Sequence, residues 1–260
     1  MDLDVERSLA KADAARELLA GRMTVNLKRP DLGHSPFDIA ARLCGLENLL
    51  LWCAECPDRV RDLMRFLSRS HVEHHDRRGR EGRINLHRDG EYARVGFRVH
   101  AWRPGAGSTA RLADEWAYVS AQTSSGLGPE QYESLVEPSS VELAAPFTRG
   151  TVYYHGCECL DRKLTSIARI PNLRRLHVSP WSSLPAARAA LGDRVIYEVH
   201  TNPSEVFFGA KRAEIRRGLD GLVAQGRGCA MDLNLSDIHS VNMRPELLGV
   251  WAAEAREASA

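Results

Sequence analysis

A histidine and a cysteine separated by a single residue, His155 and Cys157, are the residues of this sequence best suited to carry chemistry. They follow the run 151–154 (TVYY), whose β-branched and aromatic residues are typical of a strand. An imidazole nitrogen and a thiolate sulfur are ligands that zinc prefers in proteins. The spacing therefore predicts half of a metal site, at the point where a strand ends and a loop begins.

A catalytic zinc ion needs three protein ligands and one open position, and the sequence offers two alternatives for the third ligand. Cys229 stands at the start of a predicted strand, 229–235, whereas Asp237 and His239 follow its end. The two ends of a parallel strand lie on opposite faces of a barrel, separated by about 3.3 Å per residue. Cys229 cannot reach His155 if the strand begins at Cys229. The choice between Cys229 and the pair Asp237 and His239 therefore depends on where the strand starts.

Two further groups of possible metal ligands have simpler interpretations. His71, His74 and His75 would share one face of a helix, but their neighbours are mostly charged, which favours a solvated face. Cys53 and Cys56 have the spacing of a redox or metal motif. No second cysteine pair and no βαβ pattern accompany them, so packing at a helix end is favoured.

The composition is that of an ordinary globular domain. A chain of 260 residues can form one core, and barrels of alternating strands and helices commonly reach about 250 residues as one domain. Lys and Arg number 35 against 34 Asp and Glu, so no net field attracts nucleic acid or an anionic membrane. No secretory signal and no membrane-spanning run is recognisable. We expect a cytoplasmic protein with neither of these partners, whose six cysteines are reduced.

The first part of the chain is expected to be mostly helical, because apolar residues recur there at helical spacing. Helices are expected at 5–20, at 36–50, where Gly45 disfavours one unbroken helix, and from 57 onward, with strands at 23–27 and 93–99. The glycine-containing loop 103–109 lacks the lysine of a phosphate loop, so nucleotide binding is not expected. Residues 1–33 are expected to form an N-terminal helix, strand and loop outside the main repeat.

Strands and helices alternate in the rest of the chain, after a stretch at 112–120 that fits either. Helices are expected at 128–137, 161–168, 184–191, 204–225 and 245–258, and strands at 151–155, 174–178, 194–199 and 229–235. This order implies a parallel sheet. We therefore predict a single domain over 1–260, of the α/β class, with a (β/α)8 TIM-type barrel. Only six or seven strands are identifiable, so the barrel is expected to be incomplete at the N-terminus.

Several short segments resemble, in order, the uroporphyrinogen decarboxylase superfamily, and most closely its branch of corrinoid-dependent methyltransferases. The segments are 120–122 (SAQ), 128–132 (GPEQY), 154–158 (YHGCE), 179–181 (SPW), 202–203 (NP) and 237–241 (DIHSV). Members of that branch are zinc-dependent (β/α)8 barrels that move methyl groups between a separate corrinoid protein and a thiol or other acceptor. They hold zinc through a His-x-Cys pair and a later cysteine.

The resemblance implies a zinc cofactor held by His155 and Cys157, with Cys229 matching the later cysteine in chain order. Asp237 and His239 begin like the DxHxxG motif of a cobalamin-binding module, but Asn242 stands where glycine is required. The methylcobalamin is therefore expected on a separate corrinoid protein.

Further candidates are the carboxyl groups of Asp237 and Glu158 for catalysis, and Gln122, Trp181 and Asn202 for binding a small-molecule methyl acceptor. Two alternatives to a methyltransferase remain. The beginning of the family's chain is not recognisable here, which suggests a truncated paralogue that binds a metal or small ligand as an oligomer or with a completing subunit. A zinc-free decarboxylase is the third hypothesis.

Overall fold

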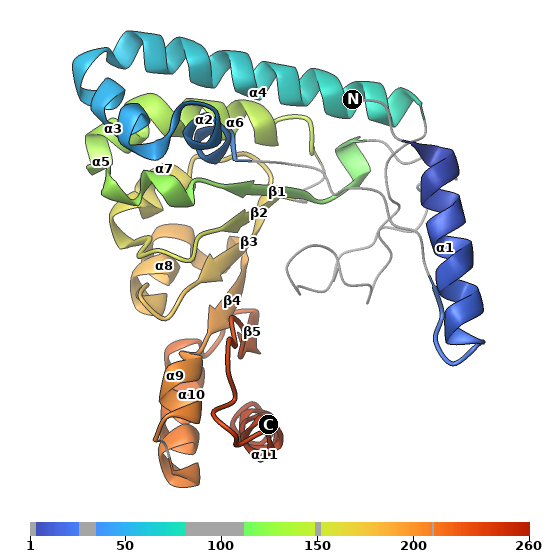
Figure 1. Ribbon diagram of the computed structural model, residues 1–260. Coiled ribbons are helices and arrows are strands. Elements are labelled where there is room, and N and C mark those ends of the chain that lie inside the picture. Colours follow the sequence, from blue (N-terminus) through green and yellow to red (C-terminus); the bar gives the residue numbers. More distant parts are fainter. Residues whose placement is uncertain (1–3, 26–34, 82–111, 149–151, 210) are drawn as a thin grey trace.

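The computed structural model describes residues 4–25, 35–81, 112–148, 152–209 and 211–260. Its centre is a parallel sheet of five strands that follow one another in chain order. They are β1 (Ala117–Ser120), β2 (Val152–His155), β3 (Leu173–Val178), β4 (Ile196–His200) and β5 (Met231–Asn234). The α/β class and the parallel sheet are thus confirmed (Figure 1). Over the described residues the sheet does not close into a barrel, so closure stays a prediction.

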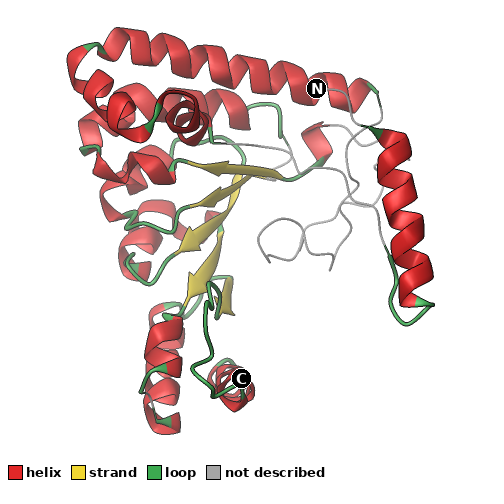
Figure 2. Ribbon diagram, viewed as in Figure 1, coloured by secondary structure: helices red, strands yellow, loops and turns green. Residues whose placement is uncertain are grey.

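One face of the sheet is apolar and covered by helices. Val119, Tyr154, Leu176 and Val199, one from each of the first four strands, are at most 2% exposed and belong to one core cluster. The helices that contribute to this cluster are α6 (Glu137–Ala144), α7 (Leu164–Ile167) and α8 (Leu184–Leu191) (Figure 2). Successive side chains of a strand point to opposite faces, so the intervening residues form the other face.

Helices α2 (Pro36–Cys44), α3 (Leu46–Glu55) and α4 (Pro57–Arg80) pack on one another beside β1. Helix α1 (Val5–Leu19) lies apart from α2 and α3 (Figure 1). Ser35 caps α2 by accepting a hydrogen bond from the backbone N–H of Asp38 at 3.4 Å. Gly45 separates α2 from α3 and has a φ of +85°, which glycine adopts without steric cost. The segment expected as a helix at 36–50 is therefore divided in two at Gly45, the residue that disfavoured an unbroken helix.

The helix expected at 128–137 is present but continues further. It consists of α5 (Pro129–Gln131), a π-helical turn at Tyr132–Val136, and α6. Tyr132, Leu135 and Val136 bury this segment against α2, α3 and α4. This packing places α2, α3 and α4 next to the end of β1.

A separate apolar cluster lies after β4, around α11 (Glu246–Ala258), and includes buried residues from Val206 to Ala255. The single helix expected at 204–225 is wrong. It is divided into α9 (Pro203–Phe207) and α10 (Arg212–Gln225). Gly209 lies in the interruption, and glycine disfavours continuation of a helix.

Some expectations fall wholly or partly outside the described residues. Residues 23–25 are not in a strand, and the remainder of the segment expected at 23–27 is outside the described part. The strand expected at 93–99 and the loop at 103–109 are also outside it. In the part of the chain that is described, no helix combines the length and the apolar character needed to cross a bilayer.

Candidate metal centre

His155 is the last residue of β2, and its side chain lies on the sheet face opposite the helices. It pairs in register with Ser120 of β1. On the other side, Tyr153 pairs with Arg175, and His177 pairs with Glu198, which in turn pairs with Asp232. The register therefore brings side chains from all five strands to one level near the carboxyl end of the sheet.

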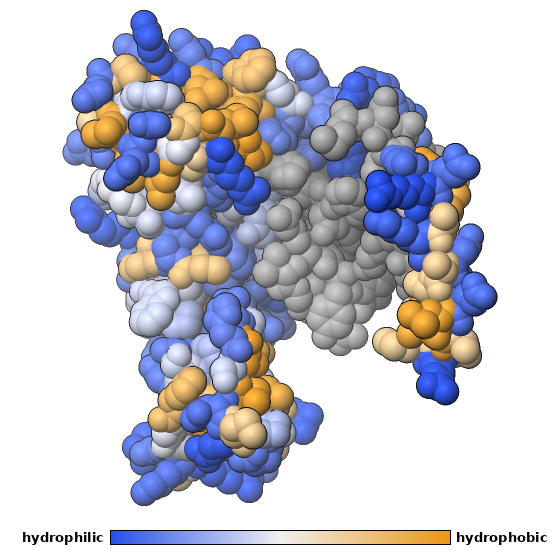
Figure 3. Space-filling view, viewed as in Figure 1, coloured by the Kyte–Doolittle hydropathy of each residue, from blue (hydrophilic) through white to orange (hydrophobic). Residues whose placement is uncertain are grey.

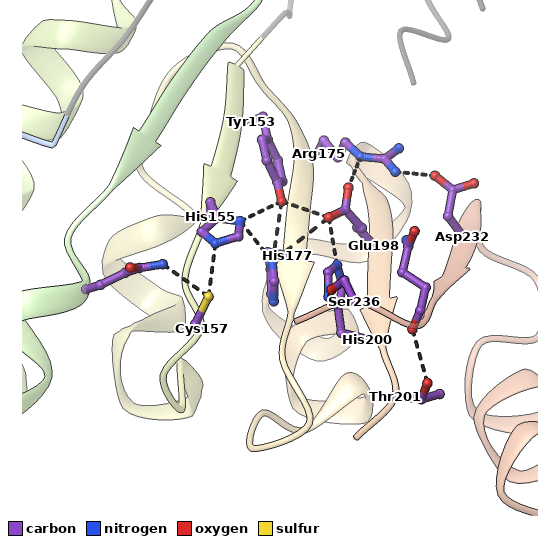
Figure 4. A network of polar contacts seen from close by, with 12 residues as sticks. Tyr153, His155, Cys157, Arg175, His177, Glu198, His200, Thr201, Asp232 and Ser236 are labelled. Carbon is purple, nitrogen blue, oxygen red and sulfur yellow. Dashed lines mark hydrogen bonds and ion pairs between the residues drawn. The ribbon is translucent and has the colours of Figure 1, made fainter. Parts of the chain in front are cut away.

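His155 and Cys157 point toward each other. Nε2 of His155 lies 3.1 Å from Sγ of Cys157, and the side-chain amide of Gln122 donates to the same sulfur at 3.2 Å (Figure 4). Zinc binds histidine nitrogen at about 2.0 Å and cysteine sulfur at about 2.3 Å, so two atoms this close can bind one ion after a small separation. The structure thus brings together two predicted ligands and one predicted substrate-binding residue.

The surroundings of Cys157 keep its thiol protonated in the absence of a cation. Partial burial raises the pKa of the thiol, and the carboxylates of Asp237 and Glu158 raise it further, against a hydrogen bond from Gln122 that lowers it. A bound metal ion reverses this preference, because a coordinating thiol is deprotonated. The negative charges around Cys157 would then attract the cation.

Asp237 and His239 lie on the loop after β5, as expected from their position in the chain. Both are exposed, and Asp237 has a left-handed backbone conformation with φ of 58°. The carboxylate of Asp237 is near enough to Cys157 to affect the pKa of its thiol.

Cys229 lies away from this centre. It precedes Asp232, the β5 residue level with His177 and Glu198, by three positions, or about 10 Å along an extended chain. Its side chain packs with the core on the helix-covered face, and Sγ donates to the carbonyl oxygen of Gly226 at 2.9 Å. Cys229 is therefore not among the residues that the structure brings together.

A buried polar network lies beside the His155–Cys157 pair (Figure 4). Glu198 accepts hydrogen bonds from Arg175 Nε at 2.7 Å, from Tyr153 Oη at 2.8 Å and from His200 Nε2 at 2.8 Å. Burial alone would raise the pKa of Glu198, but the hydrogen bond from His200 and the charge of Arg175 outweigh it and lower the pKa. Glu198 is therefore a carboxylate, fully used as an acceptor.

His177 connects this network to His155. Its Nδ1 is 2.9 Å from Nδ1 of His155, and its ring stacks on that of His200 with centroids 4.0 Å apart. Burial lowers the pKa of His177 far below its ordinary value, and the neighbouring histidines and Arg175 lower it further, so the ring is neutral. His177, Glu198 and His200 form a buried donor group that could also hold a metal ion.

Glu158 pairs with a lysine rather than with the histidines. Lys163 Nζ donates to Glu158 Oε1 and to Ser124 Oγ, each at 3.1 Å. Burial raises the pKa of Glu158, against the charge of Lys163, which lowers it. Glu158 stands next to Cys157 in the chain and acts on its thiol through charge.

Trp181 and Asn202 lie on the loops after β3 and β4. The side chain of Trp181 is 64% exposed, so it is available to a ligand. Asn202 caps α9 by accepting from the backbone N–H of Ser204 at 3.0 Å. Asn202 also lines, with His200, a cavity of about 330 Å³ between β4 and helices α10 and α11. The capping role expected of a loop residue and a position in a cavity wall are thus combined in Asn202.

The two other groups of cysteines and histidines lie outside this centre. The solvated face expected for His71, His74 and His75 is wrong for His75, which is 1% exposed. His71 Nδ1 contacts the carbonyl oxygen of Leu67 at 2.7 Å, and the three rings of His71, His74 and His75 do not converge on a metal site in the described part of the chain. Cys53 is 3% exposed, and burial raises the pKa of its thiol to about 11. Neither group adds to the centre.

Sequence reasoning missed Tyr153, Arg175, His177, Glu198 and His200. A signal was present, because Arg175 and His177 alternate with apolar residues in β3, as Glu198 and His200 do in β4. Strands of a parallel sheet covered on both faces are ordinarily near-continuous apolar runs. Polar residues at every second position of such strands therefore indicate that one face of the sheet carries a functional site.

Comparison with known proteins identifies the fold. No protein-family model matches the sequence, and no curated protein is similar to it at a significant level. Among solved structures, the chain is similar to a methyltransferase from Methanosarcina mazei, with a TM-score of 0.58 and 12% sequence identity. The match covers 97% of this chain and 64% of that chain, so this chain spans less than two thirds of the methyltransferase's length. At this identity the likeness shows a shared α/β fold.

Proposed function

We propose that this chain is a zinc-dependent methyltransferase that passes a methyl group between a methyl-corrinoid protein and a small thiol or similar acceptor. The observation that carries the proposal is the 3.1 Å contact between His155 Nε2 and Cys157 Sγ at the carboxyl end of a parallel strand. Similarity of fold to a methyltransferase supports it. Zinc would supply the means to bind an acceptor thiol as a thiolate at neutral pH while leaving the sulfur nucleophilic.

The residues of the site fit a zinc ion. Nitrogen, sulfur and carboxylate oxygen are all zinc ligands, and Asp237 brings a carboxylate whose charge acts on Cys157. We propose His155, Cys157 and Asp237 as the three protein ligands, with His239 of the same loop as the alternative to Asp237. Three ligands leave one position for the acceptor sulfur.

Other residues of the site have roles that suit methyl transfer. Gln122 donates to Cys157 Sγ and would hold that sulfur in place. The pKa of Glu158 is raised by burial, the direction that suits a group that accepts and returns the acceptor's proton. Trp181 and Asn202 would contact the body of the acceptor, Trp181 from an exposed loop and Asn202 from the cavity beside His200.

The methyl donor is proposed to be methylcobalamin on a separate protein. Asn242 replaces the glycine that a DxHxxG cobalamin motif starting at Asp237 would need. The site would therefore be approached by a corrinoid protein in the cytoplasm. Docking of that protein would place the methyl group beside the His155–Cys157 pair.

The proposal is tested by zinc content and by methyl transfer. We expect purified protein to hold a single zinc ion by elemental analysis, and to demethylate methylcobalamin when a thiol is supplied. Cys157→Ser should lose both properties. Cys159→Ser changes a neighbouring exposed cysteine and should keep both. Protein prepared without chelators that neither holds nor takes up zinc, and transfers no methyl group, would refute the proposal.

A second candidate is a binding subunit that works with a partner. It is favoured by apolar side chains exposed over α2 and α3, where Leu43, Leu46 and Leu51 are 69%, 43% and 55% exposed (Figure 3). Contiguous exposed apolar surface marks interaction sites. Methyl transfer by the isolated chain, shown by light scattering to be a monomer, would exclude this candidate.

A further inference from the structure

The hydroxyl group of Tyr153 lies between the Glu198 carboxylate and the His155 ring (Figure 4). Tyr153 Oη is 2.8 Å from Glu198 Oε1 and 2.8 Å from His155 Nδ1. Each of these distances is that of a hydrogen bond, so each contact needs a proton. A phenol has one proton, and its position determines what His155 must do.

Glu198 settles where the phenol proton lies. It is paired with Arg175 and also accepts from His200 Nε2 at 2.8 Å, so it is a charged group that can only accept. The phenol proton must therefore lie toward Glu198. The oxygen of Tyr153 is then an acceptor for the ring of His155, and Nδ1 of His155 must carry a proton.

His177 leads to the same conclusion from the other side. Its Nδ1 is 2.9 Å from Nδ1 of His155, so one of these nitrogens donates and the other accepts. If Nδ1 of His155 carries the proton, it shares that proton between Tyr153 Oη and Nδ1 of His177, which themselves lie 3.4 Å apart. Nδ1 of His177 is then an acceptor, and His177 holds its own proton on Nε2. One arrangement of protons thus satisfies Tyr153, His155, His177 and Glu198 together.

We infer that Glu198, held by Arg175, acts through Tyr153 as a positioning residue that keeps the proton of His155 on Nδ1. Nε2 of His155 then presents its lone pair to Cys157, 3.1 Å away. The partner of the remote nitrogen determines which nitrogen of a histidine can bind a metal. The consequence for zinc rests on the proposed function, whereas the tautomer itself belongs to the metal-free chain.

The tautomer is measurable by ¹⁵N NMR of the metal-free protein near neutral pH, because protonated and bare ring nitrogens have different chemical shifts and couplings. The His155 signals are identified by their absence in His155→Gln. We expect a pyrrole-type Nδ1 and a pyridine-type Nε2 in the unmodified chain. A protonated Nε2 in the metal-free protein would overturn the inference.

Glu198→Gln is expected to reverse the tautomer. The new amide must turn its oxygen to Arg175, which only donates, so its NH₂ group faces Tyr153 and His200. His200 then accepts through Nε2 and carries its proton on Nδ1, beside Ser236 Oγ. The phenol proton then moves toward Nδ1 of His155, and the ring proton moves to Nε2. An unchanged tautomer in folded Glu198→Gln protein would overturn the inference.

Tyr153→Phe provides a second test of the His155 tautomer, which can be used if Glu198→Gln does not fold. Without the phenol, the contact between His155 and His177 has two similar arrangements, so a mixture of tautomers is expected. Tyr154→Phe is the matched control. Tyr154 is equally buried, but it lies on the helix-covered face, where its hydroxyl group is hydrogen-bonded to that of Tyr132 at 2.7 Å. The control should keep the Nδ1–H tautomer. A single, unchanged tautomer in Tyr153→Phe would count against the inference.

Zinc affinity separates this inference from the proposed function. Loss of a group that orients a metal-binding histidine typically weakens binding about 10- to 100-fold, which is the loss expected for Tyr153→Phe and not for Tyr154→Phe. If the tautomer is as inferred but the chain binds no zinc, the proposed function fails and the inference stands. If both tyrosine variants bind zinc as tightly as the unmodified chain, the positioning role of Tyr153 in zinc binding fails and the proposed function stands.

Discussion

Arg175 and Glu198 form an ion pair inside the sheet, with Nε of Arg175 2.7 Å from Oε2 of Glu198 and both side chains 2% exposed. Removing one member of such a pair leaves the other charge desolvated. We expect Arg175→Met to lower the free energy of unfolding by about 3–5 kcal/mol, measured by urea denaturation.

The matched control for Arg175→Met is an exposed pair. Arg65 and Asp62 lie 2.9 Å apart on α4, with side chains 55% and 75% exposed. Water screens both charges, so Arg65→Met should change the free energy of unfolding by at most about 1 kcal/mol. Equal losses in the two variants would show that the interior pair contributes no more than a surface pair.

The third metal ligand is expected on the loop after β5. Asp237→Asn should weaken zinc binding by more than about 10-fold, the effect seen when even supporting groups are removed. Cys229→Ser should keep the zinc affinity, because Cys229 packs on the helix-covered face and its thiol donates a hydrogen bond to the carbonyl oxygen of Gly226. Competition with a chromophoric chelator measures both, and His239→Gln is measured beside them. Loss of zinc in Cys229→Ser but not in Asp237→Asn would reverse the assignment.

Gly156 joins His155 to Cys157 and has little space around it. A Cβ at this position would lie 2.6 Å from Leu160 Cδ2 and 2.9 Å from Glu158 Oε2. Leu160 is 1% exposed and cannot turn into solvent. Gly156→Ala should therefore destabilise the chain by about 1–3 kcal/mol and weaken zinc binding by displacing Cys157. In Gly128→Ala, the control, the nearest atom is 4.0 Å away, and both properties should be retained.

Glu254 of α11 connects to α10 through Arg212 and Arg216. These contacts, above all the hydrogen bond from Arg212, lower the pKa of Glu254 from its ordinary value of 4.5. A lowered folded-state pKa contributes stability that is present above the ordinary pKa and is lost as pH falls through the lowered one. Glu254→Gln should therefore be less stable than the unmodified chain near neutral pH, and the difference should shrink below pH 4.5.

Thermal unfolding of both proteins, from about pH 7 to about pH 3, measures this difference. Glu246→Gln changes a glutamate of the same helix whose side chain is 64% exposed, and should show a small difference at every pH. A difference for Glu254→Gln that does not depend on pH would show that the ion pairs with α10 are not its source.

Local patterns predicted most of the elements from residue 152 onward. β2, α8 and α11 lie within a residue or two of the expected positions, because alternation, proline and glycine act over a few neighbouring residues. The division between α9 and α10 was missed, since Gly209 alone is a weak signal within a strong helical pattern. Closure of the barrel depends on contacts between distant segments, which no local pattern contains.

The sequence by itself determined that His155 and Cys157 lie together at the end of a strand. The preceding residues favour a strand, and the covalent chain keeps the two residues close. Only the tertiary structure decided their neighbours. Strand register brings His177 and Glu198 level with His155, and the alternation of side chains puts Cys229 on the opposite face. The register of the strands, and the face of the sheet to which each side chain points, depend on which apolar surface the helices cover. Both are therefore properties of the packed sheet.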